Sequence, residues 1–226
     1  MFRAIYRIGV KLAEILRLYE TRTVRYLELF NKYVDDADVV VDLGSGTGLF
    51  SKMLSSKVKL LIALDIKSEY LKRIDEQYVE RVCADAQHLP FRKKSVNAVL
   101  AISLLEHLPS PEMCIHEASK ILLEKGMLIV QLPNLLYYIE PHTKFPMLLL
   151  PTRLKEHVRK MINYEYINFE CTINRIWKHV PTTLRLVEKR PIYHRIKTPP
   201  WPPAWILVYK KSIDQSTPLI FMKLRE

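Results

Sequence analysis

Glycine and cysteine are scarce in this chain. Only five of its 226 residues are glycine, and three of these stand within the five positions from 44 to 48. The three cysteines, Cys83, Cys114 and Cys171, are far apart, and none belongs to a Cys-x-x-Cys pair. An odd number of isolated cysteines argues against a disulfide framework and a cysteine zinc site, and it fits a reduced compartment.

Long hydrophobic runs are also missing. No apolar stretch approaches the roughly 18 residues that a membrane-spanning helix needs. Near the N-terminus, Arg3, Arg7 and Lys11 interrupt the apolar residues, so no continuous hydrophobic segment of a secretory signal remains. We therefore expect a cytoplasmic protein. The apolar residues of 2–33 recur at helical spacing, which predicts one or two amphipathic helices that pack on the domain or lie on a membrane surface.

Acidic residues are too few to balance the basic ones, and the formal net charge is +11. Residues 1–34 hold seven Lys/Arg and three acids, residues 35–133 hold twelve and fourteen, and residues 134–226 hold sixteen and seven. The basic excess therefore belongs to the two flanking parts. Such flanks suit an anionic substrate, a membrane surface or nucleic acid, and a merely solvated basic surface is the alternative.

The most informative stretch is residues 39–48, Val-Val-Val-Asp-Leu-Gly-Ser-Gly-Thr-Gly. The apolar run predicts a buried parallel strand, and the Gly-x-Gly-x-Gly that follows predicts a tight turn into a helix. Because glycine lacks a Cβ, such a turn lets bare backbone approach a ligand. A tight turn without a ligand is the alternative.

Predicted strands and helices alternate between residues 39 and 132. After the opening strand, further strands are predicted at 60–64, 79–84, 95–103 and 126–132, and helices at 47–56, 68–77 and 111–124. This alternation with short connections is typical of an open, doubly wound, mostly parallel sheet in the α/β class. Residues 134–226 hold ten of the fourteen prolines. There we expect a basic helix at Thr152–Met161 and strands at 183–187, 193–197 and 205–209 that extend the sheet edge.

Ligands of such sheets bind beyond the carboxyl ends of the strands. Asp65 ends the second strand, 21 residues after Gly44, which is the spacing of a carboxylate that accepts the ribose hydroxyls of a nucleoside. Asp85, followed by Ala86, ends the third strand and would lie beside an adenine. The alternatives are that Asp65 caps the helix after Lys67 and that Asp85 only caps a turn.

The glycine pattern does not fit a dinucleotide site. A Gly-x-Gly-x-x-Gly/Ala fingerprint needs a small residue where this chain has Leu49. Asp42 before the loop would also repel a pyrophosphate, whereas it suits a ligand that carries a positive amino group.

These residues resemble the class I S-adenosylmethionine-dependent methyltransferases, and specifically the group called methyltransferase type 11. The resemblance covers about 39–133 and rests on VVDLGSGTG, ALD, ADAQHLPF, AISLLEHLPSP and KGMLIVQLPN, in this order. It implies a seven-stranded Rossmann-like sheet with N-terminal helices and an insertion after the fifth strand. It also implies a single domain, residues 1–226, made of a helical part (1–34), a cofactor-binding core (35–133), a substrate-side insertion (134–170) and C-terminal strands (171–226).

The resemblance also implies S-adenosylmethionine as cofactor, with S-adenosylhomocysteine as product. Asp42 would hold the methionine amino group, directly or through water, and Asp65 would bind the ribose hydroxyls. The other residues expected to contact the cofactor are Gly44, Ser45, Gly46, Gly48, Ile66, Asp85, Ala86, Ala101 and Ile102.

Transfer from an activated sulfonium needs mainly proximity and orientation, and an oxygen or nitrogen nucleophile also benefits from a base near neutral pKa. His107, just after the fourth strand, is the candidate base, and a histidine that shapes the pocket is the alternative. No His-x-x-x-His or pair of carboxylates indicates a metal.

The expected reaction is methyl transfer to an O or N nucleophile, less often C, of a small molecule. In this family, the insertion after the fifth strand implies that residues 134–170 form a lid over the acceptor pocket. Its FPMLLLP run beside RLKEHVRK suits an apolar acceptor with an anionic group. The alternatives are a hydrophobic cap whose basic helix faces water, a membrane contact and a partner contact. The absence of an Asn-Pro-Pro-Tyr motif disfavours nucleic acid as substrate. An RNA or protein methyltransferase and a non-catalytic subunit that binds S-adenosylmethionine remain as alternatives, and the oligomeric state stays open.

Overall fold

The computed structural model describes residues 20–36, 38–75, 77–134, 150–161, 166–168, 171–192 and 204–213. The helices are α2 (Glu20–Tyr33), α3 (Leu49–Leu54), α4 (Ser68–Leu71), α5 (Pro111–Ile121), α6 (Thr152–Met161) and α7 (Ile173–His179), with short 3₁₀ turns η1 (Ser55–Lys57) and η2 (Leu105–His107). The strands are β1 (Val39–Leu43), β2 (Leu60–Asp65), β3 (Val79–Cys83), β4 (Val96–Ile102), β5 (Leu122–Pro133), β6 (Leu184–Ile192) and β7 (Ala204–Lys211).

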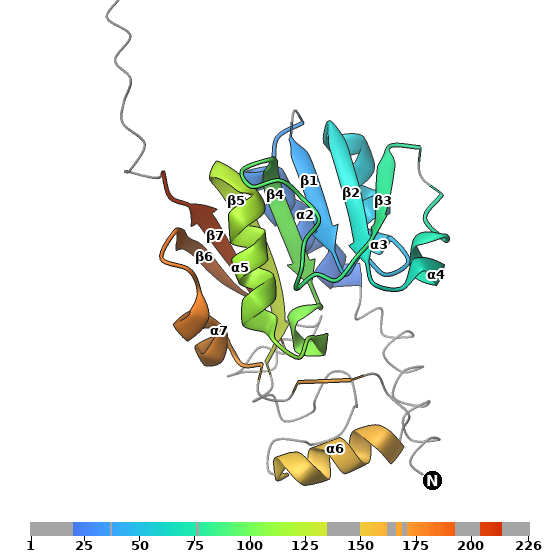
Figure 1. Ribbon diagram of the computed structural model, residues 1–226, viewed down its shortest axis with the longest axis vertical. Coiled ribbons are helices and arrows are strands. Elements are labelled where there is room, and N and C mark those ends of the chain that lie inside the picture. The colour runs from blue at the N-terminus through green and yellow to red at the C-terminus, as the bar shows by residue number, and fades with distance from the viewer. Residues whose placement is uncertain are drawn as a thin grey trace, which may run out of the picture.

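The seven strands form one sheet in the order β3-β2-β1-β4-β5-β7-β6. The first five strands are parallel, and β7 pairs antiparallel with both β5 and β6. In Figure 1 the arrows of β1, β2 and β4 point downward, whereas β7 runs the opposite way. The expected doubly wound, mostly parallel seven-stranded fold, with a strand pair added at the edge, is therefore confirmed.

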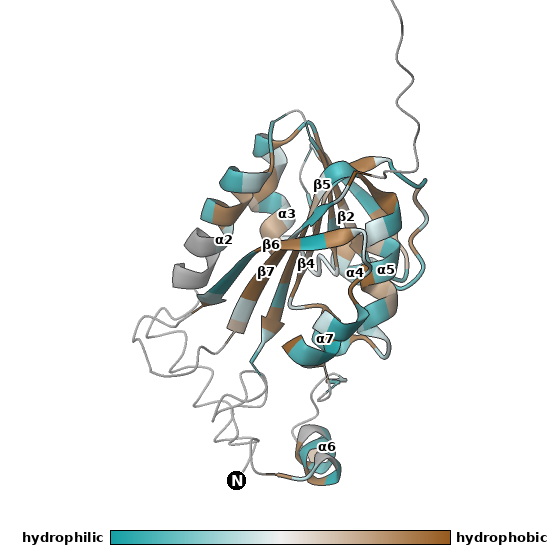
Figure 2. Cartoon of the chain, turned by 90° about the vertical axis from the view of Figure 1, so that its left-hand side faces the viewer, coloured by the Kyte–Doolittle hydropathy of each residue, from teal (hydrophilic) through white to brown (hydrophobic). Residues whose placement is uncertain are grey.

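Helices cover both faces of the sheet. Apolar residues of α2, α3 and the turn after α4 pack with one set of strand residues, and those of α5 and α7 pack with the other set. Figure 2 shows α2 and α5 on opposite sides of the strands, whose hydrophobic residues lie between them. Because both faces are covered, β1 is apolar on both, and Val40, Val41 and Leu43 are fully buried.

The carboxylate of Glu188 ties α2 to the edge strand β6. It accepts hydrogen bonds from Lys32 Nζ at 2.7 Å and Tyr33 Oη at 2.5 Å, and its other oxygen lies 2.6 Å from the Arg190 guanidinium. Burial alone would raise the pKa of Glu188, but these three partners outweigh burial and lower it from 4.5 to about 2. The ionised carboxylate therefore stabilises the docking of α2.

Several expected helices are shorter than predicted. The helix expected at 68–77 ends at Leu71, because Ile74 turns inward and its side chain packs against Gly48. The helix expected at 111–124 begins with Pro111 but ends at Ile121, since Leu122 already pairs with Val96 in the sheet. A register shift between Val96 and Ala98 then absorbs the extra residues at the start of β5.

The C-terminal third contains one element that the sequence did not indicate, helix α7, within the segment expected to hold only strands. Helix α6 has the predicted bounds. The described residues do not include the expected strand at 193–197, most of the N-terminal helical segment or most of the 134–170 insertion. No helix in the described ranges is long and apolar enough to cross a membrane.

Candidate active site

The glycine loop leaves the end of β1 in a left-handed conformation. Gly44, Gly46 and Gly48 have φ values of 65°, 55° and 82°. At Gly48 a Cβ would also lie 2.6 Å from the Ile74 side chain, so this position requires glycine both for its backbone and for its packing. Apart from its two chain neighbours, no residue comes within 4 Å of the place that a Cβ would take at Gly46. The backbone at Gly46 is therefore bare toward a cavity.

Asp65 connects the ends of β1 and β2. Its Oδ2 accepts a hydrogen bond from the Gly46 N–H at 2.9 Å, and its Oδ1 accepts one from the Lys67 N–H, also at 2.9 Å. Each carboxylate oxygen can accept a second hydrogen bond, so the group still has capacity for two hydroxyls. The bond to the Lys67 N–H closes a turn after β2. Helix α4 begins at Ser68 and no side chain caps its N-terminus, so the alternative role of Asp65 as a helix cap is not seen.

A cavity of about 500 Å³ lies where β1, β2 and β4 end. Its walls come from the glycine loop, the start of α4, the turn after β4 and the segment 166–168. The lining residues are Gly44, Gly46, Asp65, Ile66, Lys67, Tyr70, Ser103, Leu104, His107, Leu108 and Tyr166. Five predicted site residues, Gly44, Gly46, Asp65, Ile66 and His107, are thus brought together. Ile66 is 66% exposed, which leaves its side chain available to a flat ring.

The other predicted cofactor-binding residues do not line the cavity. These are Asp42, Ser45, Gly48, Asp85, Ala86, Ala101 and Ile102. Asp42 is 2% exposed, and its Oδ2 accepts a hydrogen bond from Ser51 Oγ at 2.8 Å. Burial raises the pKa of Asp42 from 3.8 to about 7, against the lowering effect of the Ser51 bond. Its predicted contact with an amino group would therefore have to pass through the loop or a water molecule.

Asp85 forms a turn with the residues that follow it. Its Oδ1 accepts a hydrogen bond from the Gln87 N–H at 2.8 Å, and its Oδ2 lies 3.4 Å from His88 Nδ1. Burial alone would raise the pKa of Asp85, but the bonds from Gln87 and His88 outweigh burial and hold it below 3.8. The structure thus shows the turn-capping role expected as the alternative for Asp85.

His107 is held by a segment far along the chain. Its Nδ1 lies 2.8 Å from the backbone oxygen of Tyr166. A carbonyl can only accept, so Nδ1 carries the proton and the lone pair of the neutral ring is on Nε2. Asn168 fixes the same segment through two hydrogen bonds to backbone oxygens. Its backbone N–H donates to the backbone oxygen of Glu106 at 2.6 Å, and its side-chain amide donates to that of Leu108 at 3.2 Å.

Sequence reasoning missed Ser103, Tyr70 and Tyr166 as residues of the cavity. Ser103 has φ of 53°, an uncommon value for a residue other than glycine, and its Oγ donates to Gln131 Oε1 at 2.5 Å. Tyr166 lies in no pattern that ties it to the end of β4. Only for Ser103 was a signal present, since it is the last residue of the predicted fourth strand. Among the described residues, no group of three His, Cys, Asp or Glu side chains could hold a metal ion.

Comparison with known proteins gives one family. Residues 41–130 match the model of the methyltransferase domain. A protein of Methanocaldococcus jannaschii, MJ0638, described as uncharacterized, is 36% identical over 107 residues, which are 47% of this chain and 46% of that protein. The malonyl-[acyl-carrier protein] O-methyltransferase of a Marinomonas strain is 31% identical over 103 residues, 42% of this chain and 38% of the enzyme. The chain thus spans about half the length of the curated relatives it matches, or less.

Solved structures share the fold. The complex of the Haloferax volcanii Trm112 methyltransferase activator with a methyltransferase described as putative matches with a TM-score of 0.61 at 18% identity, over 94% of this chain and 98% of that chain. The N-methyltransferase NodS of Bradyrhizobium japonicum, in complex with S-adenosylhomocysteine, matches with a TM-score of 0.59 at 11% identity, over 84% and 85% of the two chains.

The motifs at the strand ends, the sheet order and the matched family model agree with one another. The residues present also fit the cofactor of the family, because the bare backbone at Gly46 and the spare lone pairs of Asp65 face one cavity. Residues 41–130 belong to the methyltransferase domain family, and the chain carries a class I S-adenosylmethionine-dependent methyltransferase domain.

Proposed function

We propose that this chain transfers a methyl group from S-adenosylmethionine to an oxygen or nitrogen, less often a carbon, of a small-molecule acceptor. The observation that carries the proposal is that one cavity holds both Asp65 and His107. The first suits a nucleoside, and the second brings an imidazole to the same cavity. A cavity of about 500 Å³ is within the usual range for small-molecule sites.

The glycine loop and the end of β2 would hold the cofactor. Asp65 has two free acceptor positions for ribose hydroxyls, Ile66 offers an apolar surface to the adenine, and Gly46 lets the backbone approach closely. The backbone at Ala101 and Ile102 would support the methionyl part. When bound, S-adenosylmethionine supplies a methyl group already activated by its sulfonium, so orientation provides much of the rate.

His107 is the proposed general base. Because the Tyr166 carbonyl keeps the proton on Nδ1, Nε2 of the neutral ring is the atom that accepts a proton from the hydroxyl or amine of the acceptor. The imidazolium so formed keeps its hydrogen bond to the Tyr166 oxygen. Segment 166–168 thereby positions the base and forms one wall of the cavity.

The test is transfer of radiolabelled methyl from S-adenosylmethionine to a panel of acceptors that begins with anionic lipids and small phenols. With an acceptor in hand, His107→Ala should lower kcat by about 10²- to 10⁴-fold. The same variant should leave the affinity for S-adenosylhomocysteine within about twofold. His116→Ala, on the exposed side of α5, is the matched control. Equal turnover in the two variants would assign His107 a structural role.

Two alternatives have distinct outcomes. An RNA or protein methyltransferase would label RNA or a polypeptide and none of the small acceptors. A non-catalytic subunit would bind S-adenosylhomocysteine and label nothing by itself. Because one similar fold was solved with the Trm112 activator, the assay should be repeated with an activator of that type before a negative result is accepted.

A further inference from the structure

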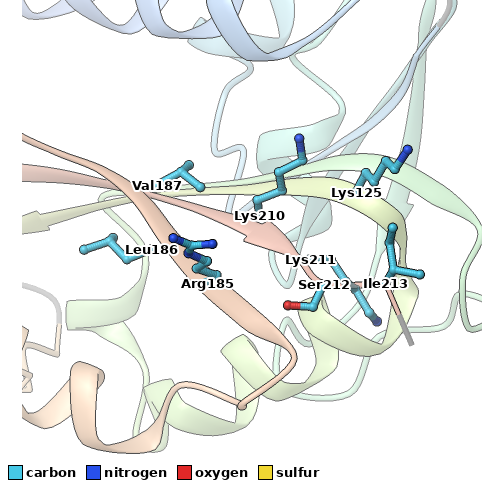
Figure 3. A pocket seen from close by; sticks show the side chains of 8 residues that line it. All are labelled: Lys125, Arg185, Leu186, Val187, Lys210, Lys211, Ser212 and Ile213. Carbon is cyan, nitrogen blue, oxygen red and sulfur yellow. The ribbon is translucent and has the colours of Figure 1, made fainter. Parts of the chain in front are cut away.

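A basic hollow of about 760 Å³ lies at one end of the sheet (Figure 3). The start of β5, the start of β6 and the end of β7 form it. Its lining residues, which define the basic hollow, are Lys125, Arg185, Leu186, Val187, Lys210, Lys211, Ser212 and Ile213. Four of these eight side chains are cationic, and none is acidic.

The basic hollow is remote from the candidate active site. Lys210 pairs with Met127 near the start of β5, whereas Ala204 at the other end of β7 pairs with Pro133 at the end of β5. These pairs are six residues apart, which corresponds to about 20 Å at the ~3.3 Å rise of a strand. A ligand in the hollow therefore does not occupy the cavity of Asp65 and His107.

Three cations of the hollow have no counter-charge among the described residues. In the part of the chain that the structure describes, no ion pair or hydrogen bond satisfies the side chains of Lys125, Arg185 or Lys210. Lys211 differs, because its ammonium donates a hydrogen bond to the backbone oxygen of Ser119 in α5. In Figure 3, Lys125 and Lys210 point to the same side of the sheet and Lys211 points to the opposite side.

Two basic residues face each other across neighbouring strands in the basic hollow. Arg185 of β6 and Lys210 of β7 are direct partners in the antiparallel ladder. Like charges directly opposite each other destabilise a sheet, and no acid lines the hollow to relieve the repulsion. An anion bound between the two side chains would remove this cost.

We propose that the basic hollow binds the phosphate backbone of single-stranded nucleic acid. The cations come from three adjacent strands, spaced at about 4.8 Å, and so span more than one phosphate group. The surface is concave, which suits a polymer strand better than the flat surface of a membrane. Val187 and Ile213, which are 42% and 55% exposed, supply apolar contacts for sugars and unstacked bases.

The test measures binding of a labelled single-stranded RNA of about twelve nucleotides by fluorescence anisotropy over a salt series. Lys210→Glu should weaken binding about tenfold or more and should reduce the slope of log affinity against log salt by about one. Lys59→Glu is the matched control, because exposed Lys59 precedes β2 at the same end of the sheet, with β1, β4 and β5 between β2 and β7.

Two readouts separate binding from folding. Both variants should bind S-adenosylhomocysteine like the parent chain, and Lys210→Glu should melt no lower than the parent, since it turns a like-charge pair into an opposite-charge pair. Equal losses of RNA affinity in both variants would overturn the proposal, because net charge alone would then explain binding. Binding of inorganic tripolyphosphate or of phosphatidylserine vesicles without binding of RNA would overturn it as well.

Discussion

Removal of the Asp65 carboxylate tests the cofactor site most directly. Asp65 is 8% exposed, and each carboxylate oxygen accepts one backbone N–H, from Gly46 or from Lys67. One lone pair per oxygen then remains for the two ribose hydroxyls. Hydrogen bonds of this kind contribute about 1 to 3 kcal/mol, so Asp65→Ala should weaken binding of S-adenosylhomocysteine roughly five- to 150-fold.

Isothermal titration with S-adenosylhomocysteine measures this change. Glu69→Ala is the control, because Glu69 is an exposed carboxylate in the first turn of α4 and does not line the cavity. Asp65→Ala also leaves two backbone N–H groups without their acceptor, so a melting curve must show that the variant is folded at the temperature of the titration. An affinity equal to that of the parent chain, in a folded variant, would refute the assignment of Asp65 to the ribose.

Three further predictions concern stability. Gly48→Ala should lower the free energy of unfolding by about 2 kcal/mol or more, measured by urea denaturation, because φ of 82° and the Ile74 side chain both oppose a Cβ. The pKa of Glu188 is about 2 in the fold and 4.5 in the unfolded chain, so its contribution is present above pH 4.5 and is lost as the pH falls toward 2. Glu188→Gln should therefore flatten the dependence of the free energy of unfolding on pH between pH 2 and 4.5. An unchanged slope would contradict the stabilisation of the Glu188 carboxylate by Lys32, Tyr33 and Arg190. The pH dependence that Asp42 contributes has the opposite sign, because burial raises its pKa from 3.8 to about 7. Its neutral carboxyl group stabilises the fold below pH 3.8, and this contribution is lost as the pH rises toward 7. Asp42→Asn should therefore melt higher than the parent at pH 8, by a margin that shrinks at acidic pH.

The parts of the fold that local patterns determine were predictable. The buried strands, the glycine turn and the carboxylate at the end of β2 follow from residue type and spacing, and the structure brings Gly46 and Asp65 within hydrogen-bonding distance. The premature end of the helix after Ser68 was not predictable, because it depends on Ile74 packing against Gly48, a contact between distant segments. The anchoring of His107 by Tyr166 is of the same kind, since 59 residues separate the two.

The position of β7 has a consequence for synthesis of the chain. The last of the described strands to leave the ribosome, β7, is inserted between β5 and β6 rather than added at the rim of the sheet. In the described part of the chain, β7 is the only strand that pairs with β6 and the only one on the second edge of β5, so neither strand has this partner until residues 204–211 emerge. The nascent chain must therefore carry this open edge of β5 from the synthesis of Pro133 until residues 204–211 emerge. Such an edge is a natural binding site for a chaperone and a natural start for aggregation.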